Sequence, residues 1–110
     1  MDDLTKAQKK VIVSLYKNYL DRKSSMSDDQ ARRYPNVAYL HENYFSDIGS
    51  DDLFSICCAL HRKGYITCSY YDNTAYLIAL TDKTVICMEQ RFLNGIVGKS
   101  YSMFRLSRIG

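Results

Sequence analysis

The 110-residue sequence predicts a small α+β domain that is mainly helical. Two adjacent stretches carry this prediction. Residues 50–63 place apolar side chains at helical spacing, and residues 65–80 are rich in β-forming side chains on both sides of a turn-like Tyr71-Asp72-Asn73-Thr74. Helical spacing recurs in residues 4–23 and 82–93, so we expect helices there and a hairpin between the last two helices.

The stretch 50–63 has the features of an amphipathic helix. Ser50 is the expected N-cap, and Asp51 and Asp52 suit the positive end of the helix dipole. Gly64 can end the helix. The expected inner face is apolar and consists of Leu53, Ile56, Cys57 and Leu60. The expected outer face carries small and charged residues, namely Asp51, Ser55, Cys58, Ala59 and Arg62.

The residues around this helix end resemble a known family. Leu60-His61-Arg62-Lys63-Gly64-Tyr65-Ile66, a hairpin, and then Leu80-Thr81-Asp82-Lys83 are similar to the third helix, wing and wing exit of winged helix-turn-helix domains, as in MarR-like and PadR-like regulators. The resemblance covers roughly residues 4–92. It implies a winged helix-turn-helix with a C-terminal helix after the wing, in a domain of residues 1–93 with the helix-turn-helix at 36–63 and the wing at 65–80.

The first half of the chain predicts three further features. Helix 4–23 has an apolar stripe formed by Leu4, Ala7, Val11, Leu15 and Tyr19, widened by Ile12, Tyr16 and Leu20. Ser27 and Gln30 have capping-box spacing, which predicts a helical turn to Tyr34 that Pro35 ends. Residues 36–44 have roughly helical spacing, with a strand at 37–40 as the competing interpretation.

The second half ends in a helix and a basic segment. Thr81 can cap helix 82–93, whose apolar stripe contains Val85, Met88 and Phe92, and Gly95 and Gly98 are expected to interrupt it. Residues 94–110 form a basic, aromatic segment. We expect it to pack, to mediate dimerisation or to reach nucleic acid, with disorder as the remaining alternative.

The charge distribution is uneven. The formal net charge is +3, which permits an anionic partner without requiring one. Residues 24–56 nevertheless contain two basic and six acidic residues, so the middle of the chain is acidic. The first residues are polar and no apolar run is long enough to span a bilayer, so we expect no signal peptide, no membrane association and a cytoplasmic protein.

The residues that carry chemistry do not form a catalytic or metal-binding pattern. The sequence lacks a phosphate-binding glycine loop and the usual hydrolase and zinc motifs, so we expect neither an enzyme nor a cofactor. We expect Cys57, Cys68 and Cys87 to be buried, whereas Cys58 is a candidate for redox sensitivity because the helix wheel turns it outward.

The resemblance implies a small DNA-binding protein, a transcriptional regulator that acts as a homodimer on double-stranded DNA. The recognition-helix residues it implies are Ser55, Cys58, Ala59, Arg62 and Lys63, and those of the wing are Tyr70, Tyr71, Asn73 and Thr74. Candidate phosphate contacts outside these elements are Lys6, Lys9, Lys10, Arg105 and Arg108. The alternative is a winged-helix module that binds a protein partner and no DNA, because Asp51, Asp52 and Asp72 stand where DNA-binding proteins often carry positive charge.

Overall fold

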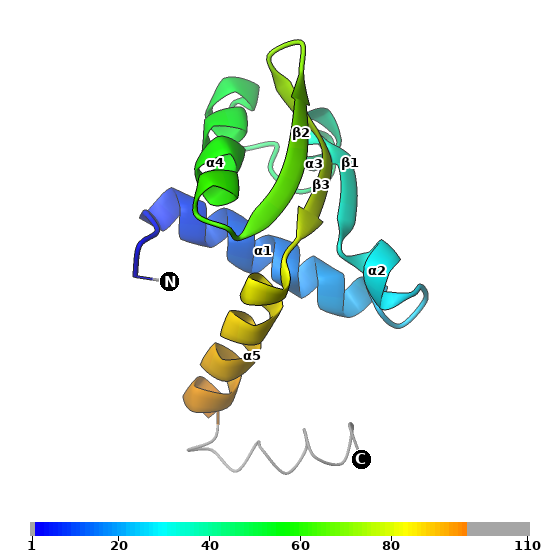
Figure 1. Cartoon of the computed structure of the whole chain (residues 1–110), viewed down its shortest axis with the longest axis vertical. Helices are drawn as coiled ribbons and strands as arrows, with labels where there is room; N and C mark the ends of the chain where they lie inside the picture. Colours follow the sequence, from blue (N-terminus) through cyan, green and yellow to red (C-terminus); the bar gives the residue numbers. More distant parts are fainter. Residues whose placement is uncertain (1, 97–110) are drawn as a thin grey trace.

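The structure, a computed structural model, describes residues 2–96, and the side chains of residues 2–91. It is an α+β domain that is mainly helical, as the sequence predicts, with one small antiparallel sheet (Figure 1). The elements in chain order are α1 (Lys6–Arg22), α2 (Asp28–Ala31), β1 (Arg33–Asn36), α3 (Val37–Asn43), α4 (Ser50–Arg62), β2 (Ile66–Tyr71), β3 (Thr74–Leu80) and α5 (Asp82–Ile96).

The sheet has the strand order β1-β3-β2, with β3 in the centre. The β2–β3 hairpin confirms the predicted turn, because Asp72 and Asn73 have φ angles of 55° and 60°, as a two-residue primed turn requires. The register of β2 against β3 shifts between Thr67 and Ser69. Near this shift Leu77 has a φ angle of 54°, and its side chain is 67% exposed.

The third strand, β1, was not predicted. Residues 33–34 belong to this strand and not to a helical turn that continues to Tyr34, because α2 ends at Ala31. Pro35 lies within β1 rather than ending a helix; β1 is an edge strand, where a residue without an N–H is tolerated. The competing strand at 37–40 is wrong, since α3 begins at Val37 and the Asn36 side chain caps it.

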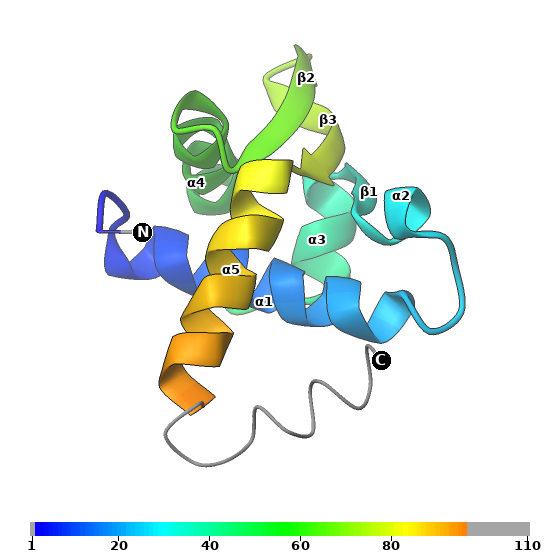
Figure 2. The same cartoon turned by 60° about the horizontal axis from the view of Figure 1, so that its bottom comes forward.

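The helices cover the sheet and enclose the core. Figure 1 shows α4 beside β2 and α3 behind the sheet, while α1 crosses below them. Figure 2 shows α5 running away from the sheet past α1. The core is formed by the inner faces of these elements, and its largest fully buried side chains include Tyr19, Tyr34, Phe45, Leu53, Leu60 and Ile78.

The residues that cap the helices agree only in part with those predicted from the sequence. Thr5 caps α1 through a reciprocal capping box with Gln8, which the sequence prediction did not include. Ser27 caps α2 as predicted, by accepting a hydrogen bond from the Gln30 N–H. Ser50 is not an N-cap: Gly49 occupies that position, and no side chain caps α4. Ala7 and Leu20 of the predicted α1 stripe are exposed, because the helix buries a narrower arc.

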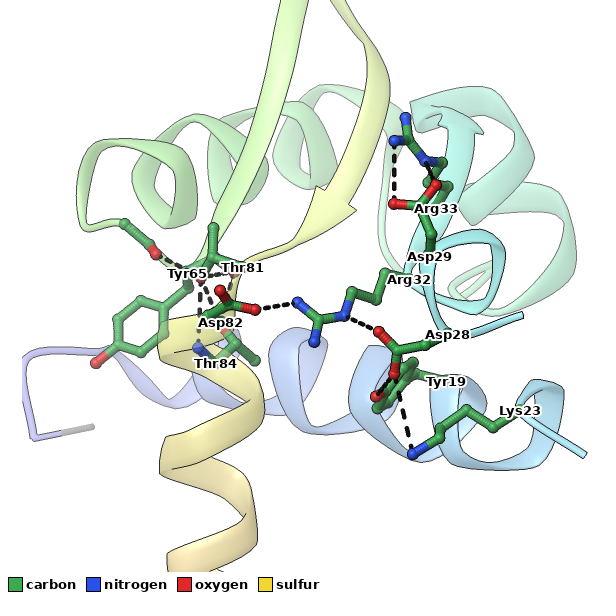
Figure 3. Close-up of polar contacts among 11 residues, drawn as sticks. Tyr19, Lys23, Asp28, Asp29, Arg32, Arg33, Tyr65, Thr81, Asp82 and Thr84 are labelled. Carbon is green, nitrogen blue, oxygen red and sulfur yellow. Dashed lines mark hydrogen bonds and ion pairs between the residues drawn. The ribbon is translucent and has the colours of Figure 1, made fainter. Parts of the chain in front are cut away.

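A polar network joins α1, α2 and α5 (Figure 3). The Tyr19 hydroxyl donates a short hydrogen bond to Asp28, and the Arg32 guanidinium lies 2.9 Å from Asp28 and 2.6 Å from Asp82. Burial and the bond to Asp28 raise the pKa of Tyr19 to about 12. The same hydrogen bond, aided by Arg32, lowers the pKa of Asp28. Through Arg32, the network connects α2 to the first residue of α5, just after β3.

The last helix is longer than predicted. Thr81 caps it, since its hydroxyl accepts from the Thr84 N–H at 3.3 Å, and Val85 and Met88 are buried as expected. It continues to Ile96 and contains Gly95, because a single glycine only weakens a helix. The side chain of Phe92 and the predictions for residues 97–110 lie outside the described part. Within residues 2–96, no helix combines the length and apolar composition needed to cross a membrane.

Candidate nucleic-acid interface

The inner face of α4 anchors the helix and leaves its outer face uncovered. Leu53, Cys57 and Leu60 are fully buried, as the apolar spacing predicts. Ser55 and Arg62 are exposed on the other side, and Cys58 is half-buried. Ala59 was predicted to face outward, but only 4% of it is exposed, because the helix packs more than one arc of its surface against its neighbours.

The hairpin lies beside this helix and is held to it by an aromatic cluster. The ring of Tyr70 packs edge-on against Phe54, with 6.2 Å between centroids, and its hydroxyl lies 2.6 Å from His61 Nδ1. Tyr70 is therefore engaged within the domain, although 47% of it is exposed. The sequence prediction missed Phe54 and His61, because only the packing of α4 against β2 brings them to Tyr70.

The tip of the hairpin is accessible. Tyr71 is 70% exposed and Asn73 is also exposed, while Thr74 is half-buried. The Tyr71 ring pairs with that of Tyr76, with 6.3 Å between their centroids. The tip therefore offers hydroxyl, amide and aromatic groups, and Asp72 is its charged residue.

The cations predicted to contact phosphate differ in availability. Lys10 forms an ion pair with Asp47 at 2.8 Å, and Lys63 donates to the Asp3 carbonyl at 2.5 Å and to Gln8 Oε1 at 3.1 Å. The side chains of Lys6, Lys9 and Arg62 have no hydrogen bond or ion pair with any other described residue. Arg105 and Arg108 lie outside the described residues.

The first turn of α4 is acidic. Asp51 and Asp52 are exposed there, and Asp47 lies in the preceding turn. The three carboxylates complement the positive end of the helix dipole, but they repel phosphate. Residues 97–110 contain three of the fifteen basic residues and none of the twelve acidic ones, so residues 1–96 carry twelve charges of each sign and are formally neutral.

The four cysteines are free thiols. Burial raises the pKa of Cys57 to about 12, and desolvation raises that of Cys68, so neither thiol is activated. Cys68 and Cys87 were predicted to be buried, but both are half-buried. Within residues 2–96, no group of three or more His, Cys, Asp or Glu side chains is arranged to hold a metal ion.

Comparison with known proteins identifies no relative: no family model, curated protein or solved structure matches this chain.

Proposed function

We propose that the chain is a winged-helix domain that binds double-stranded DNA with α4 as the recognition helix and the β2–β3 hairpin as the wing. The order of elements supports this reading: α1, the short helix α2 and the strand β1 precede the packed helices α3 and α4, and the hairpin that follows joins β1 in one sheet. The first helix, the helix pair, the hairpin and the last helix follow in the order that the sequence resemblance implies, whereas β1 was not expected.

The observation that carries the proposal is the uncovered outer face of α4 beside an exposed hairpin tip. No described residue covers Ser55 or Arg62, so the face is accessible to a major groove, which is wide enough to admit a helix. Ser55 brings little bulk to this face, which allows a close approach to base edges. Arg62 has no partner among the described residues and is available for a base or a phosphate.

The charge balance makes this binding weak and dependent on the C-terminal segment. Because residues 1–96 are formally neutral, the net positive charge that attracts a duplex resides in Lys99, Arg105 and Arg108. We propose that the protein acts as a homodimeric transcriptional regulator, since two copies would double this charge and bind two half-sites.

The test is a fluorescence-anisotropy titration of duplex DNA with the full chain at 50 and 200 mM salt. We expect binding that weakens with salt, a several-fold loss on Arg62→Ala, and a larger loss when Arg105 and Arg108 are both changed to alanine. Arg33→Ala is the matched control, because Arg33 is exposed on β1 at the far edge of the sheet and pairs with Asp29. Equal affinities for the Arg62→Ala and Arg33→Ala variants would contradict the assignment of α4.

A second candidate function, binding of a protein partner, is favoured by one observation. Lys10 and Lys63 are engaged within the domain, whereas the hairpin exposes Tyr71 and Leu77 and the first turn of α4 exposes carboxylates. Exposed tyrosine is a common interface residue. In this case no DNA binding would be detected at 50 mM salt, and changing Arg105 and Arg108 to alanine would have no effect in the titration.

A further inference from the structure

A hollow of about 480 Å³ lies between α1, the α3–α4 turn and the first half of α4. Its lining combines apolar and charged side chains, namely Ala7, Lys10, Asp47, Ile48, Asp52, Ser55 and Ile56. The volume suffices for a few side chains of a bound peptide. Apart from Ser55, the lining residues of the hollow do not belong to the outer face of α4 that we propose to bind DNA.

The charges of the hollow favour a cation. Lys10 is paired with Asp47 at 2.8 Å, so these two side chains largely neutralise each other. Asp52 has no ion pair among the described residues, so only the helix dipole and solvent balance its charge and the lining carries one net negative charge. Ile48 and Ile56 supply apolar surface beside it. A fitting occupant thus combines a positive group with adjacent apolar side chains.

This chain contains a segment of that chemistry. Residues 99–110 carry three cations and no acid, and Arg105 stands between the apolar Phe104 and Leu106. Fully extended, the nine residues from Ile96 to Arg105 span about 30–32 Å and the twelve to Arg108 about 40–43 Å, compared with a longest dimension of the molecule of 47 Å. The segment is therefore long enough to extend over much of its own domain or to a second copy.

We propose that residues 99–110 bind in this hollow, with a guanidinium of the segment pairing with Asp52 and its apolar neighbours contacting Ile48 and Ile56. A planar guanidinium suits a carboxylate because it can donate two parallel hydrogen bonds. Binding would bring positive charge to the acidic first turn of α4, beside Ser55. This proposal does not depend on DNA binding, and its test contains no DNA.

Tryptic cleavage after Arg105, followed by mass spectrometry on the native full chain, tests the proposal. The reference is a synthetic peptide of residues 99–110, whose cleavage site is fully accessible because the folded domain with the hollow is absent. We expect cleavage of the full chain to be at least ten times slower than that of the peptide, and Asp52→Lys to bring the rate close to that of the peptide. Asp51→Lys is the matched control, since Asp51 also lies in the first turn of α4 but does not line the hollow.

Each outcome bears on the proposal. Equal rates for the full chain and the peptide would overturn it. Slow cleavage that Asp52→Lys leaves unchanged, or that Asp51→Lys abolishes equally, would overturn the assignment to this hollow. Slow cleavage that Asp52→Lys alone abolishes would support the proposal, and its dependence on protein concentration would show whether the segment binds its own chain or a second copy.

Discussion

The two ends of α4 differ in how they are held. At its C-terminal end the Lys63 ammonium donates to the Asp3 carbonyl, and the Lys83 ammonium donates to the Lys63 carbonyl at 2.7 Å. Thr81 and Thr84 close the following turn, since their hydroxyls donate to the carbonyls of Gly64 and Tyr65 at 2.7 and 2.6 Å. The segment before α1, the loop residue Thr81 and the first turn of α5 thus fix this end.

The N-terminal end is left open. Gly49 is its N-cap, no side chain caps the helix, and the exposed residues of the first turn are Ser50, Asp51 and Asp52. A helix secured at one end keeps its orientation while the other end remains accessible. We therefore assign a structural role to the contacts at the C-terminal end, and the proposed recognition surface is the outer face of α4 that stays exposed, from Ser55 to Arg62.

The largest expected difference between the two ends concerns the glycines that flank α4. Gly64 has a φ angle of +85°, so Gly64→Ala should lower the free energy of unfolding by about 1–2 kcal/mol. Gly49 has a φ angle of −58°, and a Cβ added there would meet only Asp52 Oδ2, at 3.9 Å, so Gly49→Ala introduces no strain and should cost clearly less. Thermal unfolding measures both, with an expected fall in Tm of roughly 5–10 °C for Gly64→Ala alone. An equal fall in Tm for the two variants would contradict the proposed difference between the two ends of α4.

A smaller effect is expected from the hydroxyls near the two ends. Thr84 is fully buried and donates to the Tyr65 carbonyl, so Thr84→Val should cost about 1 kcal/mol. Ser50 is exposed and its side chain does not cap the helix, so Ser50→Ala should change stability by less than about 0.5 kcal/mol. Urea unfolding of the two variants provides the comparison. A larger loss of stability for Ser50→Ala than for Thr84→Val would indicate that the Ser50 side chain does cap α4.

The smallest effect concerns pH at the secured end. The Tyr65 hydroxyl donates to Asp3 Oδ1 at 2.8 Å, which lowers the pKa of Asp3, and burial with this bond raises the pKa of Tyr65 to about 12. The contribution of Asp3 is present above its unfolded pKa, near 3.9, and is lost as the pH falls through its folded pKa. The contribution of Tyr65 is present below its unfolded pKa, near 10, and is lost as the pH rises toward 12.

Tyr65→Phe removes both effects. NMR titration of the Asp3 carboxyl should then give a pKa that returns toward 3.8, the value of an isolated Asp. Tyr71→Phe is the control, because Tyr71 lies at the far tip of the hairpin and should leave the Asp3 pKa unchanged. An unchanged Asp3 pKa in Tyr65→Phe would show that the hydrogen bond is not formed in solution.

Local signals predicted those parts of the fold that depend on neighbouring residues in the chain. The apolar spacing of Leu53, Cys57 and Leu60 identified the inner face of α4, and the Asp72-Asn73 turn identified the hairpin. The strand β1 was missed because its four residues are stabilised by pairing with distant β3, and Pro35 masks it as a break.

The candidate site was predicted less completely for the same reason. Sequence spacing placed Ser55 and Arg62 on the outer face, but it could not show that Lys10 pairs with Asp47, thirty-seven positions away. Nor could it show that Lys63 turns toward Asp3, or that His61 binds the Tyr70 hydroxyl. Such partners are selected by tertiary packing, so the availability of a charge is not readable from its position in the chain.

The most direct test of the assigned recognition surface is an NMR titration of the ¹⁵N-labelled full chain with duplex DNA at low salt, read residue by residue from backbone amide shifts. The account predicts that the shifts concentrate on the outer face of α4, around Ser55 and Arg62, and on the hairpin tip around Tyr71 and Asn73. The amides of β1 and α2 should stay in place. Shifts confined to β1 and α2, or the absence of any shift, would contradict the claim that the outer face of α4 and the hairpin tip form the DNA-binding surface.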